Sequence, residues 1–87
     1  MYGSFEHNLR QTLEPTPDLR RRGKKILAIL DDKPSRRRTR RIAAMERHAA
    51  AHFGEGRAID WSKIDWSKII EVLLPLLLAL LKFIMVI

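Results

Sequence analysis

Basic residues gather in one stretch of this 87-residue chain, and their type and spacing indicate phosphate chemistry. Residues 20–41 hold eleven Lys or Arg side chains against Asp31 and Asp32, in a chain whose net charge is +7. A guanidinium group presents a planar fork of donors that pairs with two phosphate oxygens at once. We therefore predict that this stretch contacts an anionic partner. The candidate phosphate-contacting residues are Arg20, Arg21, Arg22, Lys24, Lys25, Arg36, Arg37, Arg38, Arg40 and Arg41.

Three kinds of anionic partner fit this stretch: anionic lipid headgroups, a nucleic acid and an acidic protein. Base-specific reading of a nucleic acid is disfavoured, because the stretch has no aromatic residue on which a base can stack. A simpler interpretation is that the basic residues set membrane topology and form a solvated face. Arginines at the start of a predicted helix oppose the helix dipole, and this favours an anionic partner over solvation alone.

Other residue combinations that perform chemistry are weak in this sequence. His48 and His52 are four residues apart, which places two metal ligands on one face of a helix, and Glu55 follows them. The chain has no cysteine, no HExxH pattern and no glycine-rich phosphate loop. We therefore predict that the protein is not an enzyme and uses no metal or cofactor.

A helical hairpin over residues 19–53 is the element expected to carry the basic side chains. Its first helix runs from about residue 17 to residue 30, is weakened at Gly23 and ends before Pro34. The preceding residues 1–18, which include two prolines, are expected to form an irregular arm.

The second helix of the hairpin is expected to begin after Ser35, a good N-cap residue, and to end near Phe53. Gly54 closes it, and residues 54–58 form a glycine-containing hinge. After the hinge, the five residues Ile59–Lys63 are repeated as Ile64–Lys68. This unit is too short for a repeat architecture and is interpreted as a duplicated interface segment.

The last nineteen residues, 69–87, are apolar except for Glu71 and Lys82. A helix of that length spans about 28 Å, close to the roughly 30 Å thickness of a bilayer's hydrocarbon core. We predict a C-terminal membrane anchor, with the repeat at the interface and the basic N-terminal region in the cytoplasm. The predicted membrane-interface residues are Trp61, Lys63, Trp66, Lys68 and Lys82.

Two features of this segment favour other interpretations. Only ten uninterrupted apolar residues separate Glu71 from Lys82, a length typical of a buried core helix or an in-plane segment. Pro75 removes one helical hydrogen bond and is expected to kink the helix. The sequence therefore also fits burial within a protein assembly, or a helix lying in the membrane interface.

The expected fold class is all-α: a short basic helical hairpin followed by a C-terminal apolar, transmembrane helix. The predicted function is that of a small, non-enzymatic, single-pass tail-anchored protein whose partner is the lipid bilayer and whose basic region contacts an anionic partner. The alternatives are a membrane-perturbing or pore-forming protein, and a small structural subunit buried in a larger assembly such as a viral one. A homo-oligomer is a further partner option. The layout is similar to that of small phage lysis proteins, small membrane toxins and viral membrane-associated structural proteins, in architecture only, and it transfers no residue roles.

Overall fold

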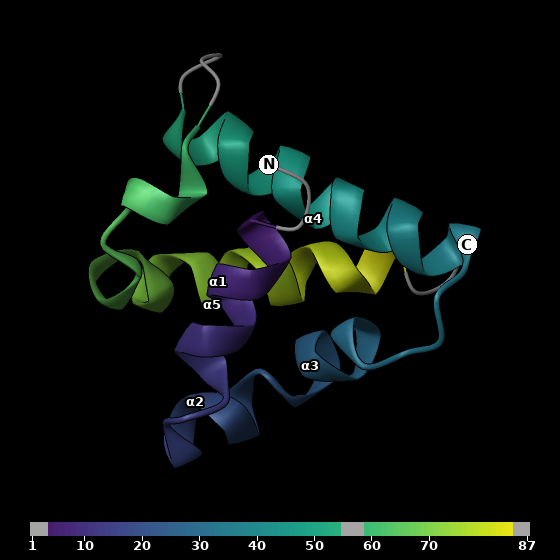
Figure 1. Ribbon diagram of the computed structural model, residues 1–87, viewed down its shortest axis with the longest axis horizontal. Coiled ribbons are helices and arrows are strands. Elements are labelled where there is room, and N and C mark those ends of the chain that lie inside the picture. Colours follow the sequence, from purple (N-terminus) through teal and green to yellow (C-terminus); the bar gives the residue numbers. More distant parts are fainter. Residues whose placement is uncertain (1–3, 55–58, 85–87) are drawn as a thin grey trace.

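The computed structural model describes residues 4–54 and 59–84, and the fold of these residues is entirely helical. The all-α prediction is confirmed. The elements are α1 (Ser4–Leu13), α2 (Pro17–Arg22), α3 (Lys24–Leu30), α4 (Arg36–Phe53), the short 3-10 helix η1 (Trp61–Lys63) and α5 (Trp66–Ile84). Figure 1 shows α4 and α5 side by side and running in opposite directions, with α1 crossing α5. Residues 55–58 of the predicted hinge lie outside the described residues.

The N-terminal region is a core element, so the prediction of an irregular arm over residues 1–18 is wrong for its described part. Phe5, Leu9 and Leu13 recur every four residues, lie on one face of α1 and are at most 1% exposed. Helix α1 packs through this face against α3, η1 and α5. The prolines of residues 15–17 end α1 and begin α2 rather than keeping the whole segment irregular.

The first predicted helix of the hairpin is divided in two at Gly23, between α2 and α3. Gly23 is buried, and a Cβ atom at this position would lie 3.0 Å from Leu13 Cδ1 and 3.1 Å from the Leu19 carbonyl oxygen. The glycine therefore allows the end of α1 to approach this junction closely. Helix α3 ends at Leu30, before Pro34, as predicted.

Helix α4 confirms the predicted second helix of the hairpin. The Arg38 backbone N–H donates to Ser35 Oγ over 3.1 Å, which makes Ser35 the N-cap, and Gly54 is the C-cap. Ile42, Met45 and Ala49 are buried, at the spacing expected for the inner face of a helix.

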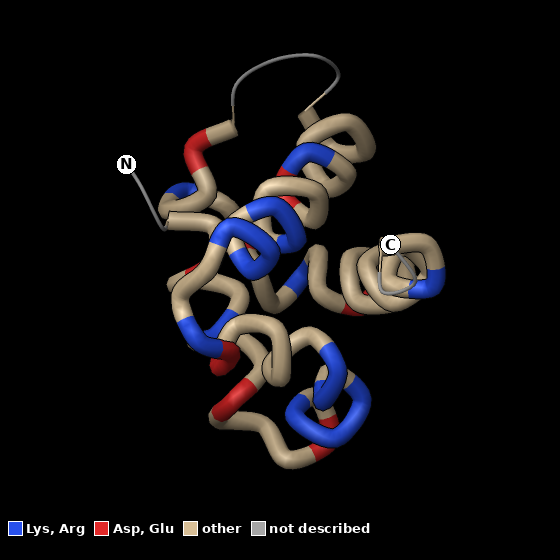
Figure 2. The backbone as a smooth tube through the Cα atoms, turned by 90° about the vertical axis from the view of Figure 1, so that its right-hand side faces the viewer, with Lys and Arg blue, Asp and Glu red and all other residues tan. Residues whose placement is uncertain are grey.

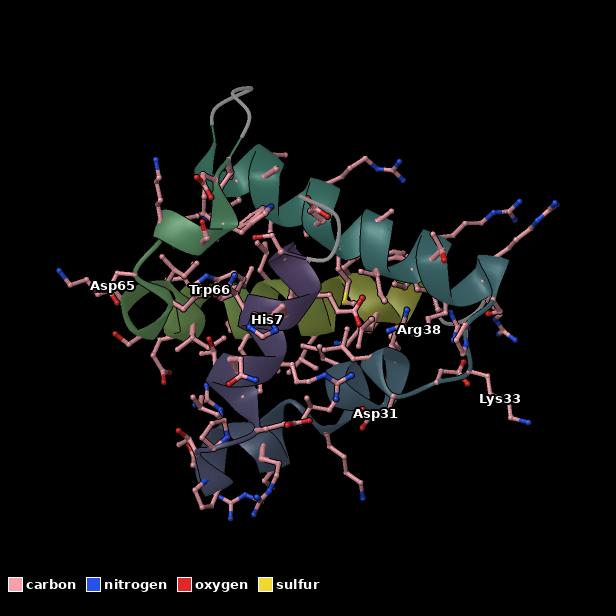
Figure 3. The ribbon with its side chains drawn as sticks, in the orientation of Figure 1. His7, Asp31, Lys33, Arg38, Asp65 and Trp66 are labelled. Atoms are coloured by element: carbon pink, nitrogen blue, oxygen red, sulfur yellow. The ribbon has the colours of Figure 1, made fainter. Side chains whose placement is uncertain are left out.

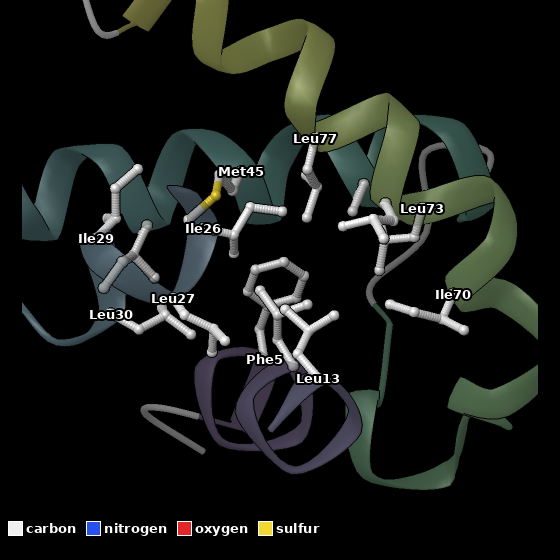
Figure 4. Packing of buried hydrophobic residues seen from close by; sticks show 14 of the residues in the cluster. Phe5, Leu13, Ile26, Leu27, Ile29, Leu30, Met45, Ile70, Leu73 and Leu77 are labelled. Carbon is white, nitrogen blue, oxygen red and sulfur yellow. The ribbon is translucent and has the colours of Figure 1, made fainter. Parts of the chain in front are cut away.

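Helix α5 lies against the protein's own core. On one face, Leu73, Leu74 and Leu77 are each at most 1% exposed, and this face meets residues of α1, α3 and α4 (Figure 4). In the part of the chain that the structure describes, no helix combines the length and the apolar character that crossing a membrane requires. The predicted transmembrane anchor therefore has no support in the structure, and the alternative of a buried helix describes this face of α5.

The two tryptophans of the repeat form an aromatic cluster with Phe5. The Phe5 ring centroid lies 4.9 Å from that of Trp61 and 5.9 Å from that of Trp66, and the two indoles are 5.8 Å apart. Both indole N–H groups are satisfied: Trp61 Nε1 donates to Glu46 over 3.1 Å, and Trp66 Nε1 donates to the Trp61 carbonyl over 2.8 Å. The repeat therefore joins η1 and α5 to α1 and α4.

Replacing Phe5 tests whether α1 belongs to the core. Phe5→Ala should lower the free energy of unfolding by about 3–5 kcal/mol, because it removes a buried ring and leaves a cavity beside two indoles. The matched control is His7→Ala, an exposed position on the same helix, which should change stability by about 0.5 kcal/mol or less. Urea unfolding followed by tryptophan fluorescence measures both. Equal stability of the two variants would contradict the assignment of α1 to the core.

Asp60 and Asp65 should make stability depend on pH at the acid end. The Ser62 hydroxyl and backbone N–H lower the pKa of Asp60, and the Ser67 hydroxyl lowers the pKa of Asp65. Unfolded aspartate, with a pKa near 3.9, binds protons more readily, so this stabilisation is complete above that value. It is lost as the pH falls through the lower folded-state pKa values.

The free energy of unfolding of the native chain should therefore fall more steeply below about pH 4 than that of the Asp60→Asn/Asp65→Asn variant. The Ser62→Ala/Ser67→Ala variant lacks the hydroxyl donors, so its free energy of unfolding should also fall less steeply below about pH 4 than that of the native chain. Parallel curves for the three proteins in chemical unfolding between pH 2 and 6 would exclude this linkage.

Candidate anion-binding surface

Four arginines at the start of α4 share one side of the helix. Arg36, Arg37, Arg40 and Arg41, named here the arginine face, are spaced so that they group along about one and a half turns. The first three are exposed and Arg41 is half-buried. They line an open hollow of about 690 Å³ together with Ala44 and with Ile84 of α5. The site is thus built by the beginning of α4 and the end of α5.

The arginine face is electrostatically uncompensated within the described residues. Every ion pair among the described residues is made by a basic side chain other than these four arginines. The backbone N–H groups of the first turn of α4 add positive potential at the same end of the helix. Four guanidinium groups around one hollow repel each other, and an anion that enters the hollow would relieve this repulsion.

Arg38 departs from the predicted cluster. It lies four residues before Ile42 and seven before Met45, on the buried side of α4, and its side chain is only 14% exposed. Its Nη2 atom is 2.6 Å from Glu6 Oε2 and donates to the Leu30 carbonyl over 2.9 Å. Figure 3 shows Arg38 beside the end of α3. Arg38 therefore connects α4 to α1 and α3, and it is not available to an external phosphate in this fold.

A second basic cluster lies on the opposite flank of α5. It consists of Arg21, Arg22, Lys24, Lys25 and Lys82, which line an open hollow of about 600 Å³ with Leu78 and Leu81. Figure 2 shows α5 between α4 and the α2–α3 segment, with basic residues on both of these neighbours. The end of α5 is therefore flanked by basic residues from two directions.

Ion pairs partly neutralise this second basic cluster. Arg21 lies 2.8 Å and Arg22 3.4 Å from carboxylate oxygens of Asp18, and Arg22 also lies 3.3 Å from Glu71. The hydrogen bonds to Glu71 raise the pKa of Arg22. These pairs are largely exposed, so each contributes little to stability.

The remaining predicted residue, Arg20, is exposed and lines a separate hollow that also contains Glu14 and Asp31. Among the predicted phosphate contacts, the arginine face is thus the part with the least internal compensation.

The predicted membrane-interface residues are not brought together. Trp61 and Trp66 are 4% and 8% exposed, so the prediction that their indoles face headgroups does not fit this fold. Lys63 and Lys68 are exposed and pair with Asp60 and Asp65 over 3.8 Å and 3.9 Å. Only Lys82 lies among other basic residues at the end of α5.

The outward face of α5 carries apolar residues that the sequence reasoning did not separate from the rest of the segment. Val72, Pro75, Ala79 and Phe83, named here the apolar ridge, are exposed, with 49% of Val72 and 69% of Phe83 accessible. Their spacing of three or four residues gives one stripe, on the side opposite Leu73, Leu74 and Leu77. A sequence signal for this side was present, because the charged residues Lys68, Glu71 and Lys82 all fall on the outer side of α5 at helical spacing.

The histidine pair shows no metal-site geometry. His48 is half-buried, His52 is exposed, and the His52 ring makes an edge contact with Phe53 at 4.7 Å. Residues 4–54 and 59–84 contain no group of three or more potential ligands that could hold a metal ion. Glu55, the third candidate, lies outside these ranges.

Comparison of the chain with protein-family models, with curated proteins and with solved structures finds no match.

Stability measurements can separate Arg38, which is a structural residue, from the arginine face, which makes no ion pair among the described residues. Arg38→Gln should lower the free energy of unfolding by about 1.5 kcal/mol, because Glu6 and the Leu30 carbonyl lose a charged donor. Arg37→Gln, one residue away on the arginine face, should change it by about 0.5 kcal/mol or less. Urea unfolding of both variants measures the difference. A loss for Arg37→Gln as large as that for Arg38→Gln would contradict this division.

Proposed function

We propose that this protein is a non-enzymatic module that binds an anionic lipid surface through the arginine face. The observation that carries the proposal is the hollow in which four arginines, without carboxylate partners in the described chain, adjoin the end of an apolar helix. Each basic residue close to an anionic bilayer contributes about 1 kcal/mol to binding. Four such residues on one surface would together supply about 4 kcal/mol, which corresponds to weak, salt-sensitive attachment.

Lipid is favoured over nucleic acid by the residues that accompany the arginines. The hollow contains Ala44 and Ile84, and the second basic cluster contains Leu78 and Leu81, so each set of charges adjoins aliphatic rather than aromatic groups. Proteins that bind single-stranded nucleic acid instead place aromatic rings within the basic groove for base stacking. Aliphatic groups next to phosphate-binding arginines suit the boundary between headgroups and acyl chains.

The proposal uses attachment to a membrane surface rather than the predicted membrane span. In the folded chain, α5 is held by its buried face, and its two ends carry Lys68, Glu71 and Lys82. A span would require this helix to leave α1, α3 and α4 and to expose their apolar residues. Surface attachment leaves the core intact.

Neutralising the arginine face should weaken binding to anionic vesicles. Arg36→Gln/Arg37→Gln/Arg40→Gln removes three exposed charges and spares the half-buried Arg41. At about 1 kcal/mol per charge, affinity for vesicles that contain phosphatidylserine should fall roughly 100-fold. The native chain should lose the same binding as salt is raised, because its contacts are electrostatic. Vesicle co-sedimentation measures both effects.

The matched control changes the net charge by the same amount at other parts of the surface. His7→Glu/Lys63→Glu, at two exposed positions on α1 and η1, has the same net charge as the first variant and should lose less than about tenfold, because charges beyond one Debye length are screened. Equal losses for the two variants would show that net charge alone drives binding. Tighter binding of the native chain to RNA than to vesicles of equal charge would overturn the assignment to lipid.

A further inference from the structure

The apolar ridge of α5 has no partner in the described chain, although it lies between two sets of basic residues. Val72 and Phe83 are the two large apolar residues with high exposure among the described positions, and both belong to this ridge. They are eleven positions apart, so the ridge extends about 16 Å along the helix. An isolated exposed apolar residue is ordinary in proteins, but a continuous stripe along one helix marks a contact surface.

We infer that the apolar ridge is a bilayer-insertion surface, which enters the headgroup–acyl boundary while the basic residues on its two sides bind lipid phosphates. This inference rests on the proposed function and assigns the orientation in which the protein meets the membrane. Helix α5 would lie in the plane of the bilayer, with Ala79 and Phe83 toward the acyl chains. The core-facing leucines would remain within the protein.

The charges on the two flanks of α5 identify the occupant. The arginine face adjoins Ile84 on one flank. On the other flank, the second basic cluster adjoins Leu78 and Lys82, and the one carboxylate there, Glu71, is paired with Arg22. On the helical wheel, the apolar ridge falls between these two flanks. An anionic bilayer supplies hydrocarbon for the stripe and phosphates for both flanks at once, which is the arrangement of in-plane amphipathic helices.

A second copy of this chain fits the ridge less well than a bilayer does. Pairing of two ridges would bring the basic flanks of one molecule close to those of the other, and like charges would then oppose association. The repulsion would be strongest at the arginine face, which lacks carboxylate partners in the described residues. The test below includes self-association as a separate outcome.

The absence of cysteine allows the orientation to be measured with single labels. Ala79→Cys places an environment-sensitive fluorophore in the middle of the ridge. His7→Cys places the same fluorophore at an exposed position on α1, which packs on the core side of α5 (Figure 3). With vesicles that contain phosphatidylserine, the label at position 79 should shift to shorter wavelengths and become inaccessible to iodide. The label at position 7 should do neither.

A ridge residue should also contribute affinity. Phe83→Gln should weaken binding to the same vesicles by about tenfold or more, since an aromatic ring no longer enters the bilayer. His7→Gln should leave vesicle affinity unchanged. Unfolding measurements on both variants should show native stability, because Phe83 and His7 are exposed in the folded chain.

Each remaining outcome has a distinct meaning. Arginine-dependent vesicle binding with position 79 still accessible to iodide would overturn the insertion surface and leave the proposed function standing. Shielding of position 79 without vesicles, increasing with protein concentration, would show that a second copy covers the ridge and would also overturn the inference. Failure of the native chain to bind anionic vesicles would overturn both proposals.

Discussion

Leu73, Leu74 and Leu77 meet α1, α3 and α4 at the centre of the molecule, and the remainder of the fold is arranged around this contact. The contact follows from two constraints: the broad apolar face of α5 has to be covered, and α1 and α3 are too short to be stable alone. Three helices suffice to cover one face of α5. The opposite face, which includes Val72 and Phe83, remains uncovered. A single apolar helix thus supplies both the core of the protein and its exposed apolar ridge.

Packing around α5 also divides the basic residues into two classes. Arg10 and Arg38 each donate to the Leu30 carbonyl over 2.9 Å, so they satisfy the end of α3 and hold α1 and α4 to it. Their charges are matched by Asp31 and Glu14 for Arg10, and by Glu6 for Arg38. The arginines on the outer side of α4 receive no such partner in the described chain. The excess positive charge of the protein is therefore concentrated beside the end of α5, where an anionic surface can approach.

Local signals in the sequence predicted the helices of the centre of the chain well. Ser35 and Gly54 fixed the ends of α4, and Pro34 followed the end of α3, because capping and proline chemistry act within a few residues. Contacts between distant segments were missed. The four-residue spacing of Phe5, Leu9 and Leu13 is a helical signal that the two nearby prolines obscured. The place of Arg38 on the inner side of α4 was also readable from its distance to Ile42 and Met45.

The charges of Lys68, Glu71 and Lys82 mark the outer side of α5 in the sequence, but hydrophobicity alone does not say whether lipid or protein covers the opposite, apolar side. The same limit applies to the tryptophans, whose amphipathic rings suit both a membrane interface and a core with a hydrogen-bond acceptor. In the structure, the acceptors are Glu46 and the Trp61 carbonyl. The contacts that place the two tryptophans join segments up to 61 residues apart in sequence, such as Phe5 and Trp66.

The central claim is that the chain meets a membrane as a folded molecule, with its core closed and only its outer surface in contact with lipid. Quenching of the native tryptophans by brominated lipids tests this claim most directly, because Trp61 and Trp66 report on the core without any substitution. Anionic vesicles with brominated acyl chains should bind the protein and leave its tryptophan emission close to that in unbrominated vesicles. Strong quenching on binding would contradict the account, since it would place the indoles at the bilayer interface and require α5 to leave the core.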